Sequence, residues 1–319
     1  MRRFTARPFF RPDREQLRYL PESPRLLRNL PGRDPVLGWV NIQDARDAHT
    51  GSINLLDLAT GKNTNFPLPG RPGFFAETER PGVVLVAMER RLVLFDLTTG
   101  QPAETGITLT EDERVIANDG LAIPGGLLIG TKHLEFRERI AALYFVEAAG
   151  SQPRVLVDGE ICSNGKYWTG GSEHATLIEI DSQPRTITRY RIDSHMRVQA
   201  SSLVAAPQSL PAIPDGLRLA PGGDSVVVAF YNPEAADTGV AQEIRLSDGE
   251  VLTVWDVPGS CRVTCPELVW WDGRVQLILT TATEGMPPEI QAVAPEAGTM
   301  FIADTPFDTL PEAPPLLRW

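Results

Sequence analysis

Short runs of apolar residues separated by turn residues recur along the whole chain, and segments with the apolar spacing of an amphipathic helix are scarce. The most regular runs alternate polar and apolar residues, as in 51–61 (GSINLLDLATG) and 91–100 (RLVLFDLTTG). Alternation of this kind predicts half-buried β-strands, and the Thr-Gly endings indicate turns. The pattern therefore predicts an all-β protein.

Each alternating strand belongs to a longer repeated unit. It follows two apolar runs joined by a Gly- or Asp-rich turn, and six such units of four short strands follow one another at intervals of roughly 40 to 57 residues. Four strands at this period are typical of a propeller blade. We predict a six-bladed β-propeller over residues 18–319, preceded by an N-terminal extension over residues 1–17. Two unrelated β-domains are the alternative, and the sixfold regularity argues against them.

Oxygen-bearing side chains stand at the head of four of the six units. The first strand of a propeller blade lines the central channel, so its opening residue is expected to lie near the axis. The four polar heads are Glu22, Asn118, Asn164 and Asp215, and the other two heads are Pro72–Gly73 and Cys265. We expect the four polar side chains to occupy one position repeated around the axis.

Two carboxylates and two carboxamides in one channel would be costly to bury without a partner. A hard cation supplies that partner, and oxygen ligands of mixed charge suit Ca²⁺ best, although Mg²⁺, Mn²⁺ and Zn²⁺ also accept them. The sequence therefore predicts a central-channel metal site that holds one divalent cation. Asn-Asp-Gly and Asn-Gly are also common turn sequences, and a turn is the interpretation for Gly120 and Gly165.

Charge and composition limit the classes of molecule that the protein is expected to bind. A net charge of −11 disfavours nucleic acid and anionic membranes. No apolar run approaches the roughly 20 residues that a membrane helix needs. Three cysteines give no disulfide framework and fit a reducing compartment. We expect a cytoplasmic protein that acts on a small molecule, with its oligomeric state left open.

Four short motifs at the blade heads resemble the regucalcin/gluconolactonase family, which includes the luciferin-regenerating proteins and is similar to diisopropylfluorophosphatase. They are ESP at Glu22, NDG at Asn118, SNG at Ser163 and PDG at Pro214. The resemblance extends from Glu22 over nearly all of the remaining chain. It implies that Glu22, Asn164 and Asp215 ligate the cation directly, and that Asn118 completes the site through the metal, a water molecule or the substrate.

The resemblance also implies the chemistry of a metal-dependent hydrolase, a lactonase of the carboxylic ester hydrolase class. The metal would polarise the carbonyl of a sugar-derived lactone, and Asp215 would act as the general base that activates water. Two alternative functions would use the same metal site. One is hydrolysis of a phosphotriester, and the other is a metal-binding propeller scaffold without turnover, because fold alone does not settle function.

The residues expected to contact the substrate differ from the family pattern. The family often has an arginine two residues before the channel asparagine, and here that residue is Ile116. Arg114 lies one strand alternation further out and points to the same side. We expect substrate contacts from Asn118, Arg114, His133 and Glu135, with Lys132 in the same segment. An exposed loop position is the alternative for Lys132, His133 and Glu135. Without an arginine at 116, a less polar lactone, or one recognised by the segment 132–138, is expected to be preferred over gluconolactone.

Overall fold

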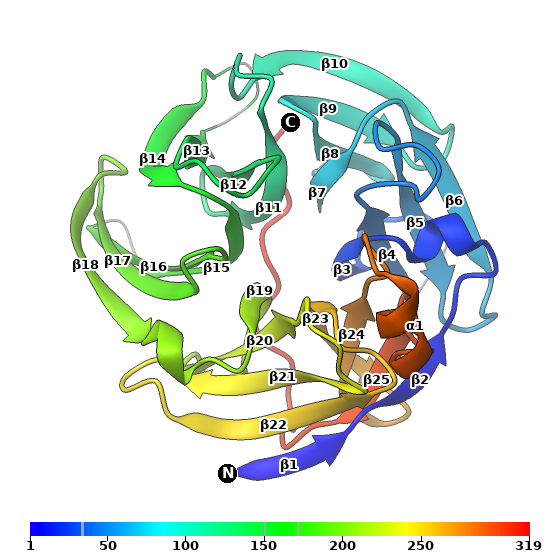
Figure 1. Cartoon of the computed structure of the whole chain (residues 1–319). Coiled ribbons are helices and arrows are strands. Elements are labelled where there is room, and N and C mark those ends of the chain that lie inside the picture. Colours follow the sequence, from blue (N-terminus) through cyan, green and yellow to red (C-terminus); the bar gives the residue numbers. More distant parts are fainter. Residues whose placement is uncertain (33–34, 148, 150, 171–172) are drawn as a thin grey trace.

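The computed structural model describes residues 1–32, 35–147, 149, 151–170 and 173–319. Within these residues, six β-sheets are arranged like blades around a central axis (Figure 1). The predicted all-β, six-bladed propeller is confirmed. Helical structure in the described residues is limited to two short 3₁₀ segments, Glu15–Arg18 and Pro207–Ser209, and the helix α1 (Pro288–Val293). None of these helices combines the length and hydrophobicity that crossing a bilayer requires.

Each blade has four strand positions, which are numbered here from the axis outward. The inner strands are β3 (Pro21–Leu27), β7 (Pro72–Glu77), β11 (Val115–Ile123), β15 (Ser163–Gly170), β19 (Ile213–Leu219) and β23 (Val263–Trp271). The second strands are β4 (Val36–Asn41), β8 (Val83–Met88), β12 (Gly126–His133), β16 (His174–Asp181), β20 (Ser225–Tyr231) and β24 (Arg274–Thr281). The second strands are almost wholly buried, because a neighbouring blade packs on each face.

The alternating segments of the sequence form the third strand of every blade. These strands are β5 (Gly51–Asp57), β9 (Arg91–Asp96), β13 (Ala141–Val146), β17 (Thr186–Asp193), β21 (Thr238–Arg245) and β25 (Met300–Asp304). The outer strands of the first five blades are β6 (Asn63–Leu68), β10 (Gln101–Thr108), β14 (Arg154–Glu160), β18 (Val198–Ala205) and β22 (Val251–Pro258).

The N-terminal segment, expected as an extension over residues 1–17, supplies strands to two blades. β2 (Arg7–Phe10) pairs with β25 and is the outer strand of the sixth blade, while β1 (Arg2–Thr5) pairs in parallel with β22 as a fifth strand of the fifth blade. Figure 1 shows both strands at the rim, beside β22 and β25. The ring is thus closed by joining residues from the two ends of the chain in one sheet.

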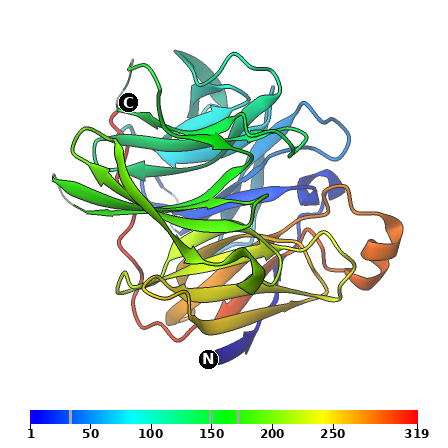
Figure 2. The ribbon, with the colours of Figure 1, turned by 60° about the vertical axis from the view of Figure 1, so that its left-hand side comes forward.

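The C-terminal segment after β25 crosses one end of the propeller, on the opposite side from α1 (Figures 1 and 2). The Leu317 amide donates to the Glu77 carbonyl at 3.0 Å, and the Glu79 amide donates to the Leu317 carbonyl at 2.9 Å. These contacts lie at the carboxyl end of β7. The heads of the inner strands, where the predicted site lies, are therefore at the other end of the channel.

Every inner strand has a β-bulge at its head. The register against the second strand shifts between Glu22 and Arg25, Pro72 and Phe74, Ala117 and Gly120, Ser163 and Lys166, Pro214 and Leu217, and Val263 and Pro266. A bulge bends the strand and re-aims its side chains. Six bulges at one level therefore turn the head residues toward the axis.

The turn interpretation of Gly120 and Gly165 is wrong, because both residues lie inside strands β11 and β15. Glycine is needed there for close approach instead. A Cβ atom at Gly165 would lie 2.4 Å from the Leu217 amide nitrogen of the next inner strand, and one at Gly120 would lie 2.9 Å from the Leu128 carbonyl oxygen. Gly165 therefore lets the inner strands β15 and β19 meet backbone to backbone, and Gly120 lets β11 lie close to β12 of its own blade.

Candidate functional site

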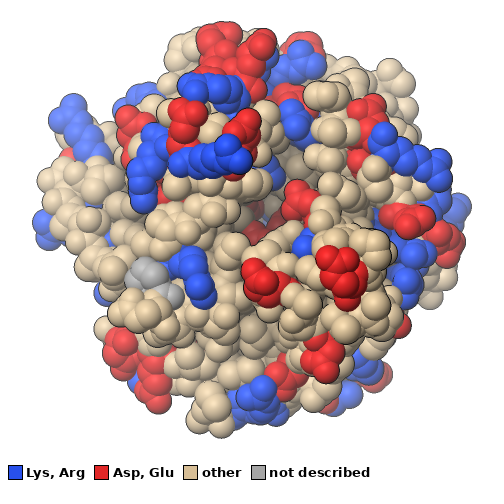
Figure 3. Space-filling model, viewed as in Figure 1, with Lys and Arg blue, Asp and Glu red and all other residues tan. Residues whose placement is uncertain are grey.

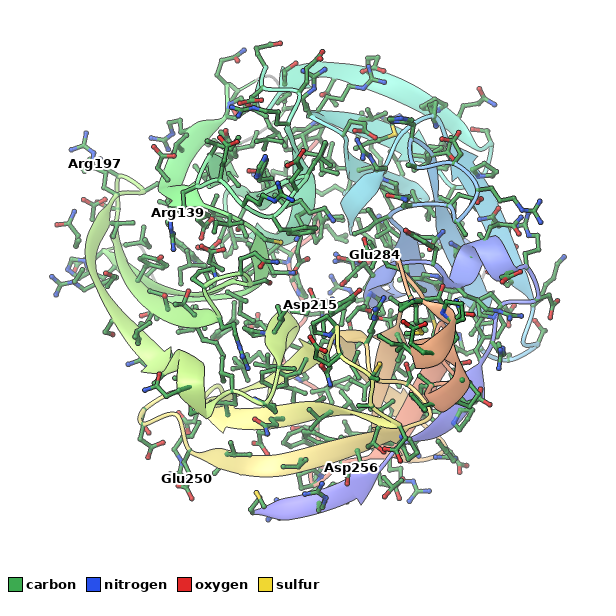
Figure 4. All side chains as sticks on the ribbon, in the orientation of Figure 1. Arg139, Arg197, Asp215, Glu250, Asp256 and Glu284 are labelled. Carbon is green, nitrogen blue, oxygen red and sulfur yellow. The ribbon has the colours of Figure 1, made fainter. Side chains whose placement is uncertain are left out.

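The four polar heads are buried together at one end of the channel. Glu22, Asn118, Asn164 and Asp215 come from β3, β11, β15 and β19, and none is more than 8% exposed. Figure 4 shows Asp215 at the centre of the ring. Asp119, which follows Asn118 in the sequence and is the alternative candidate for activating the water, is also buried.

Hydrogen bonds fix both asparagine side chains, and one of these bonds joins Asn164 to Asp215. The Asn164 amide nitrogen donates to the Asp215 carboxylate and, at 3.1 Å, to the Ser182 hydroxyl. The Asn118 amide nitrogen donates to the Ser163 carbonyl at 3.0 Å. Because the protein engages both amide nitrogens, the two amide oxygens are the atoms that remain to face a cation.

Glu22 is linked to Asp119 through Ser23. The Ser23 amide donates to Glu22 Oε2 at 3.0 Å, and the Ser23 hydroxyl donates to Asp119 Oδ1 at 3.2 Å. Ser23 has a φ of 50°, a left-handed backbone that is uncommon for this residue type and marks a locally constrained site. Asp119 Oδ2 is buried and has no hydrogen-bond partner among the described residues.

Burial and neighbouring carboxylates raise the pKa of two carboxyl groups at this site. Burial raises the pKa of Glu22 to about 8, and the Asp119 carboxylate adds to the rise. Burial also raises the pKa of Asp215 well above its usual range, and the Glu22 carboxylate adds to that rise. Charged carboxylates at this position therefore need a compensating positive charge.

This donor set fits a hard divalent cation. Two carboxylates and two amide oxygens are ligands that Ca²⁺ and Mg²⁺ accept, and the unpaired Asp119 oxygen adds negative potential beside them. Within the described residues, no group of three or more His, Cys, Asp or Glu side chains could hold a metal. A cation at this site would therefore depend on the amide oxygens of Asn118 and Asn164.

A cavity of about 200 Å³ lies over this end of the channel. It is lined by Leu20, Ile42, Gln43, Arg71, Ile116, Lys132, Leu134, Phe136 and Glu284. Leu20 and Ile116 precede Glu22 and Asn118 by two residues, so the cavity borders the heads of β3 and β11. Figure 3 shows the hollow at the centre of this face, with acidic side chains near its rim, and Figure 4 places Glu284 beside it.

The predicted substrate contacts Asn118, Arg114, His133 and Glu135 all lie outside this lining. The Arg114 side chain is 53% exposed and forms ion pairs with Asp112 at 2.8 Å and Glu138 at 2.9 Å. Glu135 is exposed and pairs with Arg137. His133 is buried, and its Nδ1 accepts the backbone amides of Arg137 at 3.2 Å and Glu138 at 2.9 Å. His133 therefore holds the loop that follows β12. Lys132, from the same segment, does line the cavity.

The sequence pattern did not single out four polar or aromatic residues of the cavity wall, Gln43, Arg71, Phe136 and Glu284, although Phe136 lies in the expected recognition segment 132–138. Arg71 stands two residues before the blade head Gly73, the same offset that relates Ile116 to Asn118. Applying that offset to every blade would have found it. Glu284 follows β24 in a loop, where no repeat position marks it.

Comparisons with known proteins agree with this architecture. The family model described as the SMP-30/gluconolactonase/LRE-like region matches residues 20–283. The calcium-binding protein regucalcin from Agrobacterium tumefaciens is 20% identical over 100% of both chains, with a TM-score of 0.81. A luciferin-regenerating enzyme is 17% identical over 94% of this chain and 96% of its own, with a TM-score of 0.77. No curated protein matches the sequence.

Proposed function

Because the chain belongs to the SMP-30/gluconolactonase/LRE-like family, we propose that it is a divalent-metal-dependent hydrolase of a small lactone. One observation carries the proposal. Four oxygen-bearing side chains from four blades, Glu22, Asn118, Asn164 and Asp215, are buried together beneath a cavity. Their burial is costly unless a cation or a substrate engages them.

In this proposal Glu22, Asn118, Asn164 and Asp215 hold the cation, with Ca²⁺ as the preferred ion. A divalent cation bound there would supply a Lewis acid that polarises the lactone carbonyl and stabilises the developing oxyanion. Asn164 fixes the orientation of the Asp215 carboxylate through its hydrogen bond. The burial that raises the pKa of Asp215 also makes its carboxylate a stronger proton acceptor, which suits a general base for an attacking water.

The cavity supports a small substrate with few hydroxyl groups. Its volume of about 200 Å³ lies below the roughly 300–1,000 Å³ of drug-sized sites. Five of the nine residues that line it are apolar, and Ile116 is one of them. A polyhydroxylated sugar lactone would leave hydroxyl groups without partners against this wall.

A panel of lactones assayed with Ca²⁺, Mn²⁺, Mg²⁺ and Zn²⁺ tests the proposed function. We expect hydrolysis that EDTA abolishes, and a higher kcat/KM for at least one small lactone, such as γ-valerolactone, than for glucono-1,5-lactone. Rates without protein correct for spontaneous opening of the rings. Glucono-1,5-lactone as the best substrate would contradict the account of the cavity. Failure to hydrolyse any lactone with any of the metals would contradict the function, and phosphotriester hydrolysis in the same assay would replace it.

A further inference from the structure

Lys132 is a nearly buried ammonium group in the wall of the cavity. It lies on β12 as the Cα partner of Ile116 on β11, and both residues line the cavity. The side chain is one of only three lysines in the sequence, and the residue is 7% exposed. Its Nζ lies 5.6 Å from the centre of the Phe136 ring, so the aromatic wall of the cavity supports the cation.

No acceptor of the protein is bonded to this ammonium group. Within the described ranges, no hydrogen bond joins the Lys132 side chain to another group, and no carboxylate lies within 4.0 Å of Nζ. Glu22 and Asp215 influence it only through space, as the Lys132 charge lowers the pKa of both carboxyl groups. A cation bound by those two carboxylates would reduce even that compensation.

The other charged groups of the cavity are already engaged. Arg71 donates from Nε to Glu89 Oε1 at 2.8 Å and from Nη2 to Glu89 Oε2 at 2.9 Å, a bidentate ion pair along one edge of its guanidinium group that compensates its charge. Glu284 accepts the Tyr231 hydroxyl at 3.4 Å. Among the charged side chains of the described lining, Lys132 is therefore the one cation that has no bonded carboxylate and can offer its donors to an anionic ligand.

We propose that Lys132 binds a carboxylate of the substrate, which makes the substrate a small lactone that carries an acidic group on a largely apolar frame. The substrate class rests on the proposed lactonase function. A formal charge in a low-dielectric cavity requires an opposite charge, because a neutral hydroxyl would leave the ammonium uncompensated. The apolar residues Leu20, Ile116 and Leu134 would contact the remainder of the ring.

The carboxylate site can be tested without turnover. The probe is tetrahydrofuran-2-carboxylate, which has the size of a small lactone and no ester bond, and its neutral counterpart is tetrahydrofuran-2-carboxamide. Titration calorimetry measures both on the Ca²⁺-loaded full chain. We expect the wild type to bind the carboxylate about 10 to 100 times more tightly than the amide, the effect of one charge-assisted hydrogen bond.

Three variants assign that preference to Lys132. Lys132→Met keeps the length and loses the charge, so the preference should disappear. Lys132→Arg keeps the charge and should retain most of it, which also controls for folding. Lys62→Met is the matched control, because Lys62 is exposed in the turn after β5, and it should behave like the wild type.

Two results would overturn the inference: equal binding of both probes by the wild type, or an unchanged preference in Lys132→Met, which would place the carboxylate on the metal alone. Failure of the proposed function would look different. Binding of the carboxylate through Lys132 without hydrolysis of any lactone would support the binding site and contradict the lactonase function. Hydrolysis of neutral lactones together with equal affinity for the two probes would support the lactonase function and contradict the role of Lys132.

Discussion

Asp215→Asn should lower kcat for lactone hydrolysis by about 10² to 10⁴, the loss typical when a positioned general base is removed. Asparagine keeps the shape of the side chain and one oxygen donor, but it removes the negative charge and the proton acceptor. The partners of residue 215 remain, since Asn164 can still donate its amide nitrogen to the new carbonyl oxygen. Steady-state kinetics with the best lactone of the panel measures the effect.

Weaker metal binding would contribute to the same loss, because a carboxamide holds a cation less tightly than a carboxylate. The assay is therefore repeated over rising metal concentrations, with Asp308→Asn as the matched control at an exposed position. Near wild-type kcat at saturating metal would make Asp215 only a ligand. Asp119, whose Oδ2 has no hydrogen-bond partner among the described residues, would then be the next candidate for the base.

In the absence of divalent metal, the protein should become less stable as the pH rises from about 4.5 to about 8. The pKa of Glu22 rises from 4.5 to about 8 in the folded protein, mainly through burial. Over this range the folded state holds a proton that the unfolded chain has already released, so raising the pH lowers the free energy of unfolding. Each pKa unit corresponds to about 1.4 kcal/mol, so a loss of a few kcal/mol is expected.

Calcium should reverse this loss above pH 8, because a cation replaces the proton on the buried carboxylate. Saturation at 100 times the Kd adds about 2.7 kcal/mol to the free energy of unfolding. Thermal unfolding in EDTA and in Ca²⁺, from pH 5 to pH 9, measures both effects. Glu22→Gln should reduce the slope in EDTA and leave the part that the raised pKa of Asp215 contributes, whereas Glu312→Gln, at an exposed position, should leave the slope unchanged. A Tm in EDTA that rises steadily with pH would contradict the account.

The fold could be predicted because each blade repeats the same local pattern. Alternating segments such as 91–100 mark the third strand, and the heads of the inner strands keep their spacing from Glu22 to Cys265. The pairing of β2 with β25 could not be predicted, since it joins residues about 290 positions apart and leaves no local signal. The bulges were also missed, because Asn-Gly and Asp-Gly are equally typical of turns.

The site was predictable only where a residue holds a repeated position. Glu22, Asn118, Asn164 and Asp215 are brought to one end of the channel by that rule. Arg114 shares the alternation of the cavity residues, but its ion pairs with Asp112 and Glu138 hold it at the surface. Side-chain partners of this kind come from separate loops, so a strand pattern does not reveal them.

A crystal structure of the protein grown with Ca²⁺ tests the central claim most directly. The account predicts one strong cation peak at the heads of β3, β11, β15 and β19, with oxygens of at least three of Glu22, Asn118, Asn164 and Asp215 at about 2.3–2.6 Å. A lattice with no cation at that position at millimolar Ca²⁺, or with the cation bound by a different set of side chains, would contradict it.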